Sequence, residues 1–401
     1  MDSESVAGWV ASVIARRQDP MISWPKPPDM EFKAVDRGLP ESFWMTYSAF
    51  ANSDRGFIVL GVSRDGDGYA VSGVGDPDGI IRDIRDGLLD RGRVSADLIR
   101  GYIGVMDVDG KDLVIMEVPR AERHLRPVYV NGRVEDGTFR RGPEGDYLCT
   151  LDEVDSMVRD SRDPIDGMVL DHMGIQDLDE ETLLEYRSVL RSMDPDGGER
   201  LTVAGLLMFG RNDRILRWNH DFHLAYMECP DDGPDWDYRL STRDTTWIGN
   251  IYNFLGRALW RFHSSIGASG CAEGAVREAL LNALMNADYG SRGGVCVTMR
   301  PGTLTVSNPG DLRIPLEMAE AGGCSDPRNP RIARMLGLIG MARGEGKGVP
   351  RIISAWEARG LGRPEYVLGY GPPRVVLRFP LPSPREAEGT RGRWVVRRRR
   401  A

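Results

Sequence analysis

Short apolar runs separated by turn signals dominate the first third of the chain. The β-rich run at 57–62 and the shorter run at 69–71 flank an Asp-Gly turn, and a second such turn joins the runs at 102–108 and 111–118. Two strands around an Asp-Gly turn predict a hairpin. Helical spacing of apolar residues predicts helices at 43–51 and 80–89. We therefore expect an α+β domain with antiparallel hairpins.

The middle of the chain is more helical. Two acidic, helix-favouring stretches lie at 151–159 and 179–193, and the second runs into an Asp-Pro-Asp-Gly-Gly turn. The apolar pattern then predicts an element at 201–209, a strand at 222–227 and an amphipathic helix at 246–262.

The last part of the chain opens with a strong helical pattern at 275–286. Strands are predicted at 295–299, 303–307 and 375–379, and a helix is predicted to begin after Pro350. Helices on one side and antiparallel strands on the other predict a two-layer sandwich.

Composition limits the class of protein. A length of 401 residues predicts two or three domains, and 41% hydrophobic with 28% charged residues is typical of a globular chain. No apolar run approaches the roughly 18 residues of a membrane span, and the N-terminus has no basic region typical of a signal peptide. Five scattered cysteines without a C-x-x-C pair indicate a reducing cytoplasm and argue against a disulfide framework or zinc site.

Charge and histidine spacing add little specificity. The net charge of −8 argues against a surface coated with phosphate-binding groups. The run Arg397–Arg400 has the charge to neutralise phosphates, but a solvated tail is the commoner meaning of such a run. His220 and His223 stand at H-x-x-H spacing without a further ligand cluster, so we interpret them as an ordinary pair on a strand or loop.

Polar residues recur along the helix predicted at 275–286. Glu278, Asn282 and Asn286 follow one another at i, i+4 spacing and therefore share one face. Asparagine is a poor helix-interior residue, so two of them beside a glutamate indicate a purpose. An amide oxygen can complete a Mg²⁺ shell, and a carboxylate can orient or deprotonate water. The alternative is the polar side of an ordinary amphipathic helix.

A glycine-rich loop follows later in the chain. Gly344, Gly346 and Gly348 occupy every second position ahead of the helix that contains Pro350, which predicts a backbone nest for anions. A mobile surface loop is the usual meaning of such a loop by itself. The order of an E-x-x-x-N helix, a strand ending in Asn-Pro-Gly, and G-x-G-x-G before a helix is much more specific.

These segments resemble the N box and the two glycine boxes of GHKL ATPases, as found in gyrase, heat-shock chaperone ninety and histidine kinases. The likeness is to the divergent bacterial branch with the patterns R-E-A-L-x-N-A, S-N-P-G, R-N-P and G-x-G. The resemblance implies ATP and Mg²⁺ as cofactors, with Glu278 as general base and Asn282 as Mg²⁺ ligand. It also implies that Asn308 reads adenine with Gly310 beside it, and that Gly344, Gly346 and Gly348 lie in the phosphate lid. The sequence departs from the family pattern at two places. Asn308 stands where the wider superfamily has aspartate, and Asn286-Ala287 stands in place of His-Arg.

The first part of the chain resembles the Schlafen/AlbA-type domain. Its blocks E-F-K, S-A-F-A-N, the strand ending in Gly-Val with an Asp-Gly turn, P-x-Y and R-x-G occur in order between about residues 28 and 157. The segment 201–210 looks like the connecting element of the same bacterial proteins.

Some members of that family cleave RNA with three carboxylates. Only Glu31 is kept here, because Lys26 and Ser63 stand at the other two positions, and a carboxylate-cluster mechanism needs several acids. We therefore expect nuclease activity to be lost. Lys33, Arg140 and Arg141 are predicted to contact nucleic-acid phosphates; a surface ion pair between Glu31 and Lys33 is the alternative.

Pattern and resemblance together predict an α+β protein in four parts. They are a Schlafen/AlbA-type nucleic-acid-binding domain at 1–160, a helical linker and connecting element at 161–270, a GHKL-like two-layer α/β sandwich that binds ATP at 271–382, and a basic tail at 383–401. The first hypothesis is an ATP-binding, nucleic-acid-binding regulator of transcription. The alternatives are an ATP-dependent nuclease or defence effector acting on RNA or DNA, and a nucleotide-gated scaffold that forms a homodimer without catalysis. No membrane association is expected.

Overall fold

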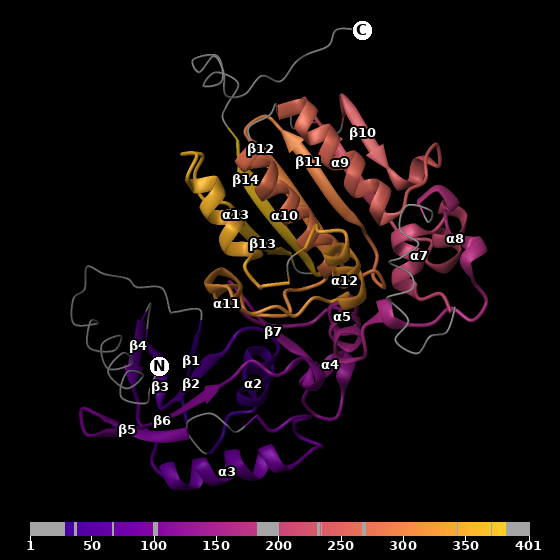
Figure 1. Ribbon diagram of the computed structural model, residues 1–401. Coiled ribbons are helices and arrows are strands. Elements are labelled where there is room, and N and C mark those ends of the chain that lie inside the picture. Colours follow the sequence, from indigo (N-terminus) through magenta and orange to yellow (C-terminus); the bar gives the residue numbers. More distant parts are fainter. Residues whose placement is uncertain are drawn as a thin grey trace. The chain divides into compact units, whose positions relative to one another are not determined.

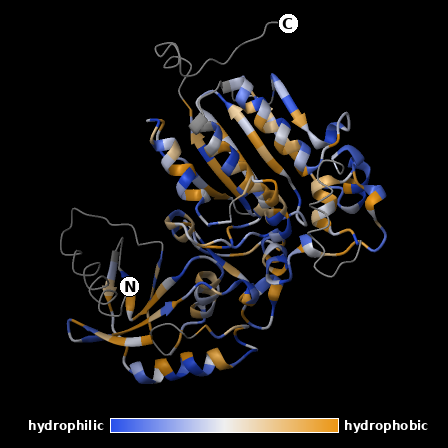
Figure 2. Ribbon diagram, in the orientation of Figure 1, coloured by the Kyte–Doolittle hydropathy of each residue, from blue (hydrophilic) through white to orange (hydrophobic). Residues whose placement is uncertain are grey.

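The computed structural model describes residues 29–35, 38–65, 68–98, 103–182, 200–230, 233, 235–266, 270–342, 344–369 and 371–381. The chain divides into two compact units, Met1–Arg162 and Asp163–Ala401 (Figure 1). Hydrophobic residues concentrate on the strands and on the inner sides of the helices of each unit (Figure 2). Within the described residues, no helix has the length and apolar character needed to cross a bilayer.

A four-stranded sheet of order β1-β2-β6-β5 forms the centre of the first unit. β1 pairs in parallel with β2, and the other pairs are antiparallel. Every residue of β2 is buried, because alternate side chains enter two hydrophobic clusters on opposite faces of the sheet. The strands are β1 (Met30–Lys33), β2 (Gly56–Leu60), β5 (Ile103–Val108) and β6 (Lys111–Val118).

The helices of this unit pack largely where the sequence predicted them. α2 (Ser42–Asn52) and α3 (Pro77–Leu89) bury their apolar residues in the larger of the two clusters. The strands β7 (Phe139–Gly142) and β8 (Gly145–Leu148) form a separate hairpin. A capping box of Thr150 and Glu153 starts the helix α5 (Leu151–Ser161). The shorter elements are η2 (Arg123–Leu125) and α4 (Val134–Gly137).

The hairpin predicted from the runs at 57–62 and 69–71 is formed by different strand residues in the structure. The run at 57–62 is interrupted at Gly61, whose φ of 96° is a conformation that favours glycine. The N–H of Gly61 donates to the carbonyl of Lys33, and its own carbonyl accepts from the N–H groups of Ser72 and Gly73. The Asp-Gly turn therefore joins β3 (Val62–Asp65) to β4 (Gly68–Val71) in a two-stranded sheet of their own.

The second unit is a two-layer sandwich, as predicted. Its six-stranded sheet has the order β10-β9-β11-β12-β14-β13, with β9 and β11 parallel and all other neighbours antiparallel. The helices α9 (Ile251–Ile266), α10 (Gly270–Asn286) and α13 (Gly348–Glu357) lie over one face of the sheet (Figure 1). The strands are β9 (Leu224–Glu228), β10 (Tyr238–Ser241), β11 (Val295–Arg300), β12 (Thr303–Pro309), β13 (Glu365–Gly369) and β14 (Arg374–Pro380).

The sheet is wider than the pattern indicated. β9 and β10 come from the stretch predicted as connecting element, and β13 was not predicted. The segment 201–209 forms the buried helix α7 (Val203–Phe209), and α9 begins five residues after the predicted start. The predicted helix at 179–193 lies largely outside the described residues, and the basic tail lies wholly outside them. The remaining elements are η3 (Ile165–Gly167), η4 (Ile175–Asp177), α8 (Asn212–Trp218), η5 (Thr242–Asp244), α11 (Leu316–Ala321) and α12 (Pro330–Leu338).

Candidate functional site

The polar stripe of α10 faces a cavity of about 700 Å³ in the second unit. The cavity is lined by Glu278, Asn282 and Asn286, which are partly exposed. Apolar residues of the same helix, such as Leu280 and Leu284, are buried in the hydrophobic core. A hydrophobic side that packs and a polar side that faces a cavity explain why a helix with Asn282 in its interior and Asn286 at its last position forms here.

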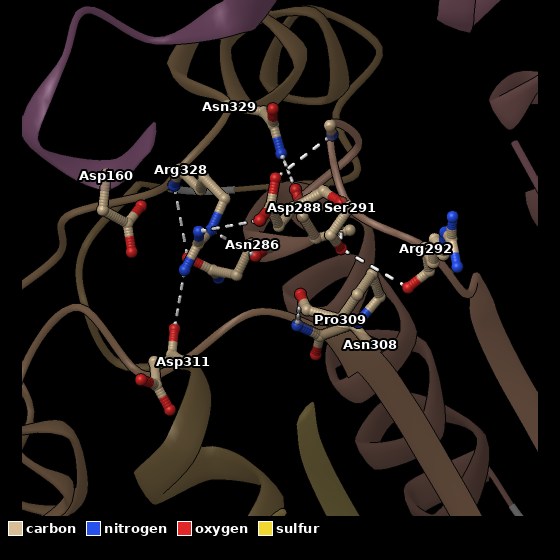
Figure 3. Close-up of polar contacts among 12 residues, drawn as sticks. Asp160, Asn286, Asp288, Ser291, Arg292, Asn308, Pro309, Asp311, Arg328 and Asn329 are labelled. Atoms are coloured by element: carbon tan, nitrogen blue, oxygen red, sulfur yellow. Dashed lines mark hydrogen bonds and ion pairs between the residues drawn. The ribbon is translucent and has the colours of Figure 1, made fainter. Parts of the chain in front are cut away.

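The C-terminal end of α10 is held by the Arg-Asn-Pro segment (Figure 3). The Asn329 side chain is fully buried and its Nδ2 donates to the carbonyls of Met285 and Ala287, at 3.1 and 2.8 Å. Nε of Arg328 donates to the carbonyl of Asn286 at 3.0 Å. Carbonyls at a helix end have no partner within the helix, so these two side chains satisfy them and fix where α10 ends.

A second connection joins α10 to the Asn-Pro-Gly turn. The backbone N–H of Asp288, just beyond the helix, donates to the carbonyl of Pro309 at 2.9 Å. Asp288 is itself buried, and its carboxylate accepts from the N–H of Gly290. The Asp-Tyr, Asn-Pro-Gly and Arg-Asn-Pro motifs thus meet at one place and position the cavity (Figure 3).

Asn308 lines the cavity from β12 and is 6% exposed. Its Nδ2 donates to the carbonyl of Pro309 at 3.1 Å, so Oδ1 is the atom of this amide that can accept from a ligand. Gly310 is not among the residues of the cavity wall. It has a φ of 94°, and a Cβ there would lie 2.8 Å from the guanidinium carbon of Arg328. The structure gives Gly310 a turn-forming position beside Asn308.

The glycine-rich loop closes the cavity opposite α10. Gly344, Gly346 and Gly348 all line it, and the first two have φ values of 66° and 63°. A Cβ at Gly348 would lie 2.7 Å from Oε1 of Glu278 and 2.9 Å from Nδ2 of Asn282. The loop therefore approaches the polar stripe of α10 as closely as a backbone without side chains allows.

The cavity also contains charged residues that the motifs did not identify. Arg351 at the start of α13 donates to Oε2 of Glu345 at 2.6 Å, and Lys347 lies 3.9 Å from the same oxygen. Burial raises the pKa of Tyr366, helped by the nearby carboxylates of Glu320 and Glu278. Lys347 and Arg351 stand close to the quoted glycines, so spacing alone could have found them; the further charged lining residues are Asp311, Arg313, Asp326 and Arg334, and the uncharged Tyr366 lines the wall as well.

In the first unit, the structure does not favour phosphate contacts by Arg140 and Arg141. Arg141 lies 2.8 Å from Glu31 and 2.7 Å from Asp146, and its guanidinium also donates to the carbonyl of Met30. These carboxylates, rather than burial, explain why the pKa of Arg141 is raised, because burial acts in the opposite direction. Arg140 is 6% exposed and lies 3.8 Å from Glu153.

Glu31 and Lys33 each contact another residue of this unit. Nζ of Lys33 donates to Oγ of Ser42 at 3.0 Å, and Glu31 forms an ion pair with Arg141. Among the residues that the structure describes, no group of three or more His, Cys, Asp or Glu side chains is placed to hold a metal ion. His223 instead contacts Oγ of Ser241 through Nε2 at 3.1 Å.

The S-A-F-A-N block has a structural task in the same unit. Nδ2 of Asn52 donates to the carbonyls of Val128 and Phe139, and its Oδ1 accepts from the N–H of Val128 at 2.8 Å. Oγ of Ser48 donates to the carbonyl of Val128 and accepts from the N–H of Phe139. Blocks of sequence that lie about eighty residues apart are thus joined by buried hydrogen bonds.

Comparison with known families agrees with this architecture. Residues 28–145 match the family model "Schlafen, AlbA_2", and residues 293–377 match the model HATPase_c_4, described as "Putative ATP-dependent DNA helicase recG C-terminal". The chain therefore carries an N-terminal Schlafen AlbA_2 domain and a C-terminal domain of the HATPase_c_4 family. These two domains indicate nucleotide binding and an ATP-dependent function connected with nucleic acids.

The solved structures that are similar to this chain include the following two. One is the DIP2311 protein from Corynebacterium diphtheriae, at 19% identity and a TM-score of 0.42, covering 94% of this chain and 69% of that one. The other is the N-terminal domain of the Putative ATP-dependent DNA Helicase RecG-related Protein from Nitrosomonas europaea, at 25% identity and a TM-score of 0.27, covering 35% of this chain and 93% of that one. No protein of curated function matches the chain.

Proposed function

We propose that the second unit binds Mg-ATP in the cavity beside α10, and that the protein uses this nucleotide to regulate a process on nucleic acid such as transcription. The observation that supports this most strongly is the convergence of Glu278 and Asn282, Asn308, and the loop of Gly344, Gly346 and Gly348 on one cavity. Its volume of about 700 Å³ is within the range of small-molecule sites.

The residues present fit the chemistry of this cofactor. The Oδ1 acceptor of Asn308 suits the amino group of adenine, and the positive-φ glycines leave backbone N–H groups free of side chains for phosphates. Mg²⁺ is usually held by one or two protein oxygens together with phosphates and waters, which the amide of Asn282 satisfies. Glu278, one turn away, would orient and deprotonate the attacking water.

The test is calorimetric titration of Mg-ATP into the full chain and into Asn282→Ala. We expect binding to wild type and a loss of about tenfold or more in the variant, because its amide oxygen is gone. Gln176→Ala removes an exposed amide from the same unit and is the matched control. Equal affinity in all three proteins would exclude the assigned site.

Hydrolysis is tested separately with Glu278→Gln, which keeps the size of the side chain but replaces the carboxylate with an amide that cannot take a proton from water. We expect this variant to bind Mg-ATP like wild type but to release phosphate at least a hundredfold more slowly, since general-base catalysis contributes about that much. Equal phosphate release would mean that a group other than Glu278 activates the attacking water.

The nuclease hypothesis gains no support from the first unit, because Glu31 is ion-paired to Arg141. Homodimer formation stays a prediction.

A further inference from the structure

One face of the six-stranded sheet lies opposite the helices. The register aligns Arg239, Met227, Thr298, Thr305, Arg378 and Glu365 across all six strands in a single row. The residues next along the strands, such as Val297, Val306 and Leu377, are buried in the core beneath the helices. Since neighbouring residues in a strand point to opposite faces, the row belongs to the other face. Its members are partly or fully exposed.

This open face is rich in arginine. The strand register places four arginines on it: Arg239, Arg300, Arg374 and Arg378. Arg243 follows β10 and lies close to Cys296, a residue of the neighbouring row on the same face. The carboxylates Asp237, Asp244 and Glu365 accompany these five arginines, Asp235 directly precedes Trp236, and Asp244 is paired with Arg239. Arg243 and Arg378 are both exposed.

Arginines outnumber carboxylates among the charged groups that act on His223. The pKa of His223 is lowered to about 4, first by burial and then by Arg243, Arg239 and Arg374, with Asp244 opposing. Thr298 and Thr305 place hydroxyl groups between the arginines on the same side of the sheet, whereas the buried hydroxyl of Ser307 accepts from Arg374. Arginines interleaved with hydroxyls are the donors that contact phosphate and sugar oxygens.

An exposed aromatic residue stands at the edge of the open face. Trp236, just before β10, is 50% exposed, and the guanidinium of Arg239 lies 5.0 Å from its ring centroid. A large aromatic ring in solvent beside cationic groups is the combination on which unpaired bases stack in proteins that bind single strands.

We propose that the open face binds single-stranded nucleic acid, with the arginines on its phosphates and Trp236 stacking on a base. This rests on the proposed nucleic-acid function and places the contact in the second unit instead of at Arg140 and Arg141. A protein partner would find few apolar anchors here, since the exposed members are chiefly arginines, threonines and one tryptophan.

The experiment measures fluorescence anisotropy of a labelled 20-nucleotide single strand, as RNA and as DNA, with the full chain over a series of salt concentrations. The variants are Arg243→Gln/Arg378→Gln and Trp236→Ala. The control Arg217→Gln/Arg363→Gln removes two exposed arginines elsewhere, from α8 and from the segment after α13, where Arg363 pairs with Glu320 and Glu357. Mg-ATP binding and thermal unfolding of every variant show that the fold and the cavity are intact.

We expect the double variant to bind at least tenfold more weakly and its salt slope to fall by about 1.4, from roughly 0.7 for each lost phosphate contact to a single strand. Trp236→Ala should bind about tenfold more weakly with the slope unchanged, because stacking involves no counterion. The control should bind like wild type. If all variants bind the oligonucleotide like wild type, the proposal for this face is overturned, while the nucleic-acid function stays in place. No binding of a single strand by wild type would overturn the proposal for this face but not the nucleic-acid function, which a duplex could serve, and Mg-ATP binding would stand or fall separately.

Discussion

At the scale of single residues, Gly348 shows how the cavity depends on the absence of a side chain. An added Cβ would lie within 3.0 Å of both Glu278 and Asn282. Such a contact forces the ends of these two side chains to move, which costs the fold little but displaces the groups proposed to hold Mg²⁺ and the attacking water. The Gly348→Ala variant should therefore bind Mg-ATP about tenfold more weakly by calorimetry.

The matched control for this variant is Gly274→Ala in the same helix as Glu278. A Cβ at Gly274 meets nothing within 4 Å, and alanine favours a helix over glycine by about 0.5–1 kcal/mol. We expect Gly274→Ala to bind nucleotide as wild type does and to be slightly more stable. If both variants bind normally, the loop has more freedom than its contact with α10 indicates.

His223 supplies a pH prediction at the same scale. Its pKa of about 4 in the folded protein is below the ordinary value of 6.5. Between these two values the unfolded chain binds a proton that the folded chain does not, so acidification across this window favours unfolding. Denaturant midpoints measured from pH 7 to pH 4 should fall more steeply for wild type than for His223→Gln, whose amide can still contact Ser241. Parallel curves would mean that His223 is protonated in the folded state.

At the scale of elements, the end of α10 depends on Asn329. Its side chain donates to two carbonyls at the helix end, those of Met285 and Ala287, which also accept from the backbone N–H groups of Asn329 and Tyr289. Asn329→Ala removes the two side-chain hydrogen bonds, each worth about 0.5–1.5 kcal/mol. We expect this variant to lose about 1–3 kcal/mol in the free energy of unfolding, measured by denaturant titration. Asn212→Ala, which also removes a side chain bonded to backbone, is the comparison for a position remote from the cavity. It should keep nucleotide affinity, whereas Asn329→Ala should reduce it.

Elements whose signal is local were predictable from sequence. Helical spacing was enough to predict the polar stripe of α10, and the Asp-Gly turn was enough to predict the hairpin of β5 and β6. Gly61 was not predictable as a break, because its positive φ follows from contacts with Lys33 and Ser72 that lie outside the strand. The same holds for the width of the large sheet, since β9 pairs with β11 about seventy residues away.

Charged side chains were the least predictable part of the site. Sequence places Arg140 and Arg141 on a strand, which is compatible with phosphate contacts, but it does not show that Asp146 and Glu31 approach Arg141 from two other strands. Ion pairs depend on distances of a few ångströms between segments that spacing along the chain does not define. The open face with Arg239 and Arg378 became visible only when the register of all six strands was known.

At the scale of the whole molecule, the hydrophobic clusters fall within the two units. The largest cluster runs from Leu178 to Phe379 in the second unit, and the others lie between Met30 and Met157 in the first. Each unit thus has a core of its own, as an independently folding domain requires. Asn52, with three hydrogen bonds to Val128 and Phe139, belongs entirely to the first.

Separate cores predict two unfolding transitions that respond to different changes. Mg-ATP at about one hundred times its dissociation constant should stabilise the second unit by about 2.7 kcal/mol and leave the first unchanged, because only the folded second unit binds it. Asn52→Ala should lower the other transition alone, by about 2–3 kcal/mol for its buried partners. Differential scanning calorimetry of wild type and Asn52→Ala, with and without Mg-ATP, separates the four cases. A single transition that shifts in every case would show that the units unfold as one cooperative body, and nucleotide binding would then stabilise the Schlafen AlbA_2 domain as well.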